Sequence, residues 1–224
     1  MTQDAFIEYL KEDCFIDFQH PSIRSYAEGV VGDEDDQRQI AIKLYRAVRD
    51  DIQYNPYTFE TSKSSFSASY CLAQGRSYCI PKACLLAATC RIYGIPSRLG
   101  FADVRNHLAS PQFLDYLQTD VFVMHGYVEL YLNGKWVKAT PAFDQKLCQL
   151  MGVSCLEFDG ENDSVFHAFD QQGERHMEYL KEHGTFSTIP HALILESVAT
   201  AYPHLTPEII STRRANSYQK DLSS

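Results

Sequence analysis

Two segments in the first half of the chain have the hydrophobic spacing of helices. Between Gln37 and Asp51, apolar residues recur three, four and seven positions apart, as on one face of an amphipathic helix. The acidic run at residues 33–36 suits the positive end of that helix dipole. Residues 83–93 are nearly all apolar, and Gly94 and Pro96 end this run. The pattern predicts a buried helix that begins at Cys79.

A β-hairpin is predicted further along. Residues 121–132 and 135–140 alternate in polarity around Asn133-Gly134, the strongest short-range hairpin signal in a sequence. The alternation places His125 on the more polar face of the first strand. With a two-residue turn, His125 lies opposite Ala142 and diagonal to Thr140 and Asp144, of which Asp144 alone carries a carboxylate. Pro141 leaves the pairing beyond it open.

The remaining segments complete the expected organisation. Residues 58–69, rich in Ser and Thr, predict a loop, and helices are predicted at 145–151, before Gly152, and at 191–201. The polar stretch 157–188 is expected to form one wall of a cleft. Because no linker composition interrupts the chain, we expect a single domain over residues 1–224, with a core at about 37–144 and a C-terminal extension at 145–224.

Composition narrows the class of protein. The 224 residues carry a formal net charge of −9, opposite in sign to a nucleic-acid-binding surface. No apolar run approaches the roughly 20 residues that span a bilayer, and the first residues are acidic, unlike a signal peptide. We therefore expect a soluble, cytoplasmic protein with neither nucleic acid nor membrane as partner. The seven cysteines form no CxxC pair, which favours reduced thiols.

Cys79, His125 and Asp144 are the candidate catalytic residues. A thiol at a helix N-terminus lies beside unpaired backbone N–H groups, which lower its pKa and can hold an oxyanion. His125 would act as its base, and Asp144 would orient the imidazole. The alternatives are a buried structural thiol, a histidine paired within the strand, and an N-cap for the helix at 145–151. Three further residues are weaker candidates: Gln74 as an oxyanion donor, His107 near the site, and Trp136, which is expected in the hairpin core.

Several short motifs together resemble the transglutaminase-like superfamily of papain-like cysteine enzymes. They are spread over residues 37–144 and are specific as a combination. The matching residues are Cys79, Ala83 and Arg91, the GIPSR run at 94–98, His125, the VELY run at 128–131, the GKWV run at 134–137 and the lead-in at 48–54. The resemblance differs at one position, because Thr140 precedes Pro141 where many members have an aspartate. The family's glycine before the nucleophile is also shifted, to Gly75.

The resemblance implies an α+β fold with a papain-like/transglutaminase-like core, in which the nucleophile helix packs on an antiparallel β-sheet. It also implies a Cys79–His125–Asp144 triad that attacks a carboxamide or peptide bond and forms a thioester. The partner would be a protein, peptide or small amide substrate. No cofactor and no metal are implied. Two alternatives stay open: an inactive scaffold of this fold that binds proteins, and a Cys/His metal protein.

Overall fold

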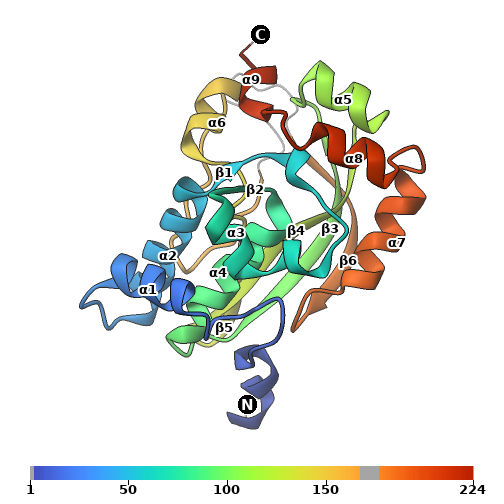
Figure 1. Ribbon diagram of the computed structural model, residues 1–224. Coiled ribbons are helices and arrows are strands. Elements are labelled where there is room, and N and C mark those ends of the chain that lie inside the picture. The colour runs from blue at the N-terminus through green and yellow to red at the C-terminus, as the bar shows by residue number, and fades with distance from the viewer. Residues whose placement is uncertain (1–2, 167–176, 224) are drawn as a thin grey trace.

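The computed structural model describes residues 3–166 and 177–223 (Figure 1). Its centre is a four-stranded antiparallel sheet in the order β5-β4-β3-β6. The strands are β3 (Ser97–Asn106), β4 (Val121–Leu132), β5 (Lys135–Ala139) and β6 (Met177–Phe186). Helix α4 (Cys79–Ile92) packs against β3 and β4. The expected α+β class, with the cysteine helix on an antiparallel sheet, is therefore confirmed.

Helix α4 is buried from Cys79 to Arg91, because helices enclose it on the sides away from the sheet. Helices α1 (Pro21–Val31), α2 (Gln37–Asp51) and α3 (Ala68–Gln74) all contact it. Figure 1 shows α4 in the centre of the molecule, with α1 and α2 on one side and α7 (His191–Ala201) and α8 (Pro207–Arg213) on the other. The short strands β1 (Gln53–Tyr54) and β2 (Arg76–Ser77) pair in parallel next to the start of α4.

At each end of α2, a side chain hydrogen-bonds to the backbone groups that the helix leaves unpaired. Asp36 caps the helix, accepting a hydrogen bond from the Gln39 N–H at 2.8 Å. At the other end, the fully buried Lys82 ammonium of α4 donates to the carbonyl oxygens of Arg49 and Ile52. A helix C-terminus carries unpaired carbonyl groups and partial negative charge, which satisfy this buried cation.

The predicted loop at residues 58–69 is partly wrong. It contains a short 3-10 helix, η3 (Lys63–Phe66), and overlaps the end of η2 (Pro56–Thr58) and the start of α3. Ser67 begins α3, since its hydroxyl accepts a hydrogen bond from the Tyr70 N–H at 3.2 Å. Serine favours N-caps as well as loops, so a Ser-rich stretch does not distinguish a loop from a helix start.

The β4–β5 hairpin has the predicted register, with Leu132 opposite Lys135 and Val128 opposite Ala139. Pairing ends there, so the predicted pair of His125 with Ala142 is wrong. Pro141 lacks an N–H and could not continue the ladder. The chain instead leaves the sheet and enters α6 (Gln145–Met151).

A bulge in the β3–β4 ladder interrupts the alternation on which the sequence prediction relied. Ala102 pairs with His125 and Val104 with Phe122, so three steps on β4 oppose two on β3. Met124 takes the left-handed backbone conformation, with φ +57°. Its N–H donates to Asp103 Oδ1 at 3.0 Å, and His183 Nε2 lies 2.7 Å from the same oxygen. The bulge changes the side to which the residues before His125 point.

The C-terminal part of the chain completes the sheet and covers one of its ends. Strand β6 pairs with β3, and α7 packs against β4. The remaining elements are η1 (Gln3–Leu10), α5 (Pro111–Leu117) and α9 (Tyr218–Asp221). None of the helices within residues 3–166 and 177–223 is both long and apolar enough to cross a membrane.

Candidate active site

Cys79 is the first residue of α4, and its sulfur lies among backbone N–H donors. These donors are its own N–H and those of Ile80 and Gly126. Gly126 belongs to β4 and approaches α4 closely, since a Cβ placed on it would lie 3.0 Å from the Ile80 Cα. Such a distance is too short without movement of the helix backbone. Gly126 therefore lets the strand come near enough to donate to the sulfur.

Burial sets the pKa of the Cys79 thiol. The side chain is 8% exposed, and its surroundings raise the thiol pKa to about 11, although the three N–H donors oppose this shift. The direction is opposite to the one predicted from the helix N-terminus. The thiolate loses more solvation in this apolar site than the backbone donors return. Cys79 is thus a neutral thiol in the free protein at pH 7.

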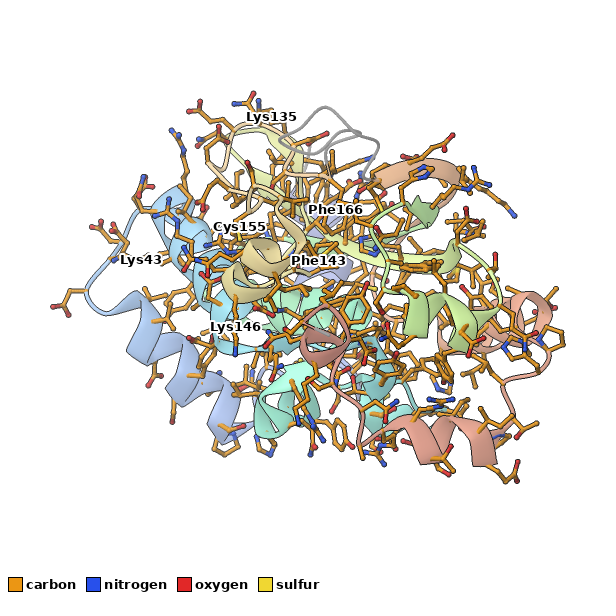
Figure 2. The ribbon with its side chains drawn as sticks, turned by 90° about the horizontal axis from the view of Figure 1, so that it is seen from above. Lys43, Lys135, Phe143, Lys146, Cys155 and Phe166 are labelled. Atoms are coloured by element: carbon orange, nitrogen blue, oxygen red, sulfur yellow. The ribbon has the colours of Figure 1, made fainter. Side chains whose placement is uncertain are left out.

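His125 precedes Gly126 on β4 and is 5% exposed. Its Nε2 is buried and has no hydrogen-bond partner among the described residues. The ring packs on Phe166, with ring centroids 5.2 Å apart. Phe166 in turn packs on Phe143, with ring centroids 4.6 Å apart, and Figure 2 labels these two side chains. Burial lowers the pKa of His125 to about 4. At neutral pH the imidazole is uncharged and can accept a proton.

Asp144 is not hydrogen-bonded to His125, although the hairpin geometry predicted the two side chains to be neighbours. Its Oδ1 caps α6 by accepting from the Leu147 N–H at 2.9 Å, and its Oδ2 accepts from the Tyr54 N–H at 2.7 Å. The Gln219 amide also donates to Oδ1, at 3.2 Å. Within the described residues, His125 is not a hydrogen-bond partner of this carboxylate. The N-cap alternative is what the structure shows, and Asp144 connects β1, α6 and α9.

The weaker sequence candidates lie away from the cysteine. Gln74 lines a separate small hollow with Tyr70 and Arg214. His107 lies 3.6 Å from the Glu178 carboxylate. Trp136 was expected in the core but is only half-buried, with the Arg98 guanidinium 4.2 Å from its ring centroid.

The alternative of a metal protein gains no support from the described part of the chain. There, no three His, Cys, Asp or Glu side chains are grouped so that they could hold a metal ion. Two of the tail histidines, His167 and His176, lie outside the described residues.

Cys79 and His125 line one pocket, with about 670 Å³ of unfilled space including its mouth. Tyr54, Tyr78 and the start of β4 also line this pocket, as do α7 and the residues that follow it. The stretch 157–188 was expected to form a wall, and its residues 167–176 lie outside the described residues. Its residue Phe166 does contact His125, but the C-terminal lining of this pocket comes from residues 194–205.

Sequence reasoning missed three residues that shape this site: Gly126, Asp103 and Tyr202. A glycine inside a predicted strand signals a close backbone approach, so Gly126 could have been found. Asp103 and Tyr202 gave no such signal. Tyr202 is distant in sequence, and its hydroxyl accepts from the Val123 N–H and donates to the Val121 carbonyl, both at 2.8 Å.

A cysteine at the start of a central buried helix and a histidine on an adjacent antiparallel strand thus line one pocket, as the resemblance to papain-like cysteine enzymes implied. The model of the transglutaminase-like superfamily matches residues 24–141, slightly more than half of the chain. The chain therefore belongs to this superfamily, as its motifs predicted.

Two of the solved structures to which this chain is similar come from different organisms. A candidate cysteine protease from Cytophaga hutchinsonii shares 18% identity with a TM-score of 0.47, over 63% of this chain and 43% of that one. A candidate protease from Parabacteroides distasonis shares 15% identity with a TM-score of 0.40, over 61% of this chain and 25% of that one. The chain thus matches less than half the length of either neighbour. No curated protein matches this sequence.

Proposed function

We propose that this protein is a cysteine-dependent acyl-transfer enzyme that acts on a carboxamide or peptide bond, with Cys79 as nucleophile and His125 as general base. The observation that carries the proposal is the contact between β4 and the start of α4. Gly126 donates its N–H to the Cys79 sulfur, and the residue before it is His125, which lines the same pocket. The membership of the superfamily supports the same pairing.

The proposed reaction begins from an uncharged pair, because the Cys79 pKa is about 11 and the His125 pKa about 4. As the sulfur attacks the carbonyl carbon and a C–S bond forms, the thiol proton passes to His125. The C–N bond then breaks, and the leaving nitrogen takes that proton. Water or an amine attacks the thioester, gives a proton to His125, and the C–S bond breaks as the proton returns to sulfur.

Asp144 enters this proposal as a positioning residue. It holds the Tyr54 N–H, and the Tyr54 ring lines the pocket beside Cys79. The His125 ring is held instead by its packing on Phe166 and by the pairing of His125 with Ala102 in the ladder. The proposed class includes a hydrolase or deamidase, when water resolves the thioester, and a transglutaminase, when an amine does.

Alkylation by iodoacetamide, with each labelled cysteine assigned by mass spectrometry, tests the proposal. We expect Cys79 to react at pH 6–7 faster than the exposed Cys14, with a rate that falls below about pH 4 as His125 becomes protonated. In His125→Gln the Cys79 rate should fall at least about tenfold, in keeping with general-base catalysis. His107→Gln is the matched control, and its rate should equal that of the wild type.

The second candidate function is an inactive scaffold of the same fold, which the raised pKa of Cys79 favours. An inactive scaffold predicts that Cys79 reacts as slowly as the buried Cys84 and Cys90 at every pH, with no difference between wild type and His125→Gln. That result would refute the acyl-transfer proposal.

A further inference from the structure

The pocket beside Cys79 is lined mainly by apolar and aromatic side chains. Apart from Cys79 and His125, its described lining residues are apolar or aromatic, and none is an aspartate, glutamate, lysine or arginine. His125 adds no charge above about pH 5, because its pKa is about 4. Arg213 contacts the outside of this lining, with its guanidinium 5.9 Å from the Tyr116 ring centroid. The interior is therefore an uncharged, aromatic environment.

The size of the pocket suits one side chain. Its cavity volume is about 100 Å³, below the range of about 300 to 1,000 Å³ that is usual for sites enclosing a whole small molecule. A water-sized group needs about 10–15 Å³ of such volume, so several of these groups fit, as many as a leucine side chain contains. An ionised side chain in the same place would lose its hydration and find no counter-charge in the lining.

One wall of the pocket comes from residues 194–205, which follow the superfamily match that ends at residue 141. Ile194 and Val198 of α7, followed by Tyr202 and Leu205, line the pocket together with residues of α5 and the start of β4. Tyr202 is held firmly, because its hydroxyl bonds two backbone groups of β4. Residues that the superfamily motif does not contain thus form this side of the site.

We propose that the pocket binds an uncharged apolar acyl group, an aliphatic or aromatic side chain next to the carbonyl that Cys79 attacks, and that the α7 wall selects it. This inference rests on the proposed function, in which Cys79 forms a C–S bond to the substrate carbonyl carbon and the C–N bond breaks. The substrate class is thus an amide or peptide with an apolar residue on the acyl side of the reacting bond.

Three chloromethyl ketones of similar shape test the inference on the unmodified protein. The N-acetyl-leucyl, N-acetyl-asparaginyl and N-acetyl-aspartyl reagents each alkylate a thiol by forming a C–S bond and releasing chloride. Mass spectrometry gives the rate at Cys79, and the exposed Cys14 in the same sample corrects for the reactivity of each reagent. We expect the leucyl reagent to label Cys79 at least about tenfold faster than the aspartyl reagent, with the asparaginyl reagent between them.

A matched pair of variants tests the wall. Val198→Lys places a cation in the lining at a half-buried position, and Leu193→Lys places one on the same helix outside the pocket, where Leu193 is 36% exposed. We expect Val198→Lys to slow the leucyl reagent at least fivefold and to accelerate the aspartyl reagent. Leu193→Lys should leave both of these rates, and the iodoacetamide rate at Cys79, unchanged.

The outcomes separate this inference from the proposed function. If Cys79 reacts with iodoacetamide in a His125-dependent way but the three reagents label it at equal corrected rates, the apolar selection is wrong and the acyl-transfer proposal stands. If Cys79 reacts with none of the reagents, the proposed function itself fails. Since the wild-type comparison needs no variant, the inference can be tested even if Val198→Lys does not fold.

Discussion

The part of the chain that matches the superfamily and the part that follows it contribute to the same pocket in different ways. Residues 24–141 supply the thiol, the imidazole and the backbone donors around the sulfur. Residues 142–166 and 177–223 supply apolar surface and supports: α7 forms a wall of the pocket, and Gln219 of α9 donates to Asp144. The reacting groups and most of the pocket lining thus come from the shared core, and the added segment supplies one wall of the cavity.

This difference also explains the position of Asp144. Asp144 is the third residue after residue 141, where the superfamily match ends. Its carboxylate hydrogen-bonds to backbone groups of both parts. It caps α6, which begins the second part, and holds Tyr54 of the first part. Three donors, the Leu147 and Tyr54 N–H groups and the Gln219 amide, already occupy most of the roughly four acceptor positions of this carboxylate.

The largest effect is expected where β4 meets α4. In Gly126→Ala the new Cβ would lie 3.0 Å from the Ile80 Cα and 3.1 Å from its Cγ1, so the strand and helix must separate. We expect a loss of about 3 kcal/mol of stability, at the upper end for overpacking, and at least a hundredfold lower iodoacetamide rate at Cys79. Denaturant unfolding and the labelling assay measure these two effects.

Gly29→Ala is the matched control for this substitution. Gly29 lies within α1, and nothing lies within 4 Å of a Cβ placed on it. Alanine there should stabilise the protein by about 0.5–1 kcal/mol and leave Cys79 labelling unchanged. Equal Cys79 rates in Gly126→Ala and wild type would show that the close strand–helix contact is not needed to activate the thiol.

The next effect is the loss of folding stability at acid pH. The pKa of His125 is about 4 in the folded protein and about 6.5 when unfolded, so the unfolded chain binds the extra proton between these values. Stability therefore falls as the pH drops from about 6.5 to about 4, by about 3 kcal/mol from this one group. Glutamine does not titrate, so between about pH 6.5 and about pH 4 the His125→Gln variant should lose about 3 kcal/mol less stability than the wild type. Unfolding curves at several pH values would measure this difference. If the two proteins lose equal stability, His125 is not buried as a neutral base.

Much of the fold was predictable because its signals are local. The helices at 37–51, 145–151 and 191–201 and the hairpin at Asn133-Gly134 are each determined by spacing, caps and turn residues within a short window. The register of β4 with β5 follows from the two-residue turn and persists as far as Ala139. Cys79 and His125 could be singled out for the same reason, since each lies in a short recognisable motif.

The rest depends on contacts between distant segments, which no local pattern encodes. The bulge at Met124 is supported by Asp103 and by Tyr202, which is 78 residues away in sequence. The thiol pKa was predicted to fall because the helix N-terminus is visible in the sequence, whereas the apolar surroundings that raise it are tertiary. Asp144 was placed beside His125 by extending the hairpin past Pro141, although the ladder ends two residues before this proline.

A smaller effect distinguishes the two roles considered for Asp144. Asp144→Ala leaves the N–H groups of Tyr54 and Leu147 without their acceptor, so we expect a loss of about 2 kcal/mol of stability. Asparagine caps helices as well as aspartate does, so Asp144→Asn should lose less. Because His125 does not bond this carboxylate, its pKa should stay within about half a unit of 4 in Asp144→Asn, as the pH dependence of Cys79 labelling would measure. A change of a full unit or more would restore Asp144 as the orienting residue.

The smallest effect tests the support that the C-terminal segment gives to the core. Tyr202→Phe keeps the ring in the pocket wall but removes the hydroxyl that accepts from the Val123 N–H and donates to the Val121 carbonyl. The cost should be about 1 kcal/mol, the usual net contribution of a buried hydrogen bond, with a two- to fivefold lower rate for the leucyl reagent at Cys79. Tyr116→Phe is the control, because Tyr116 lines the same pocket and its hydroxyl makes no hydrogen bond within the described residues. Equal behaviour of the two variants would mean that packing alone holds the α7 wall in place, and that the added segment shapes the pocket without supporting the strand that carries His125.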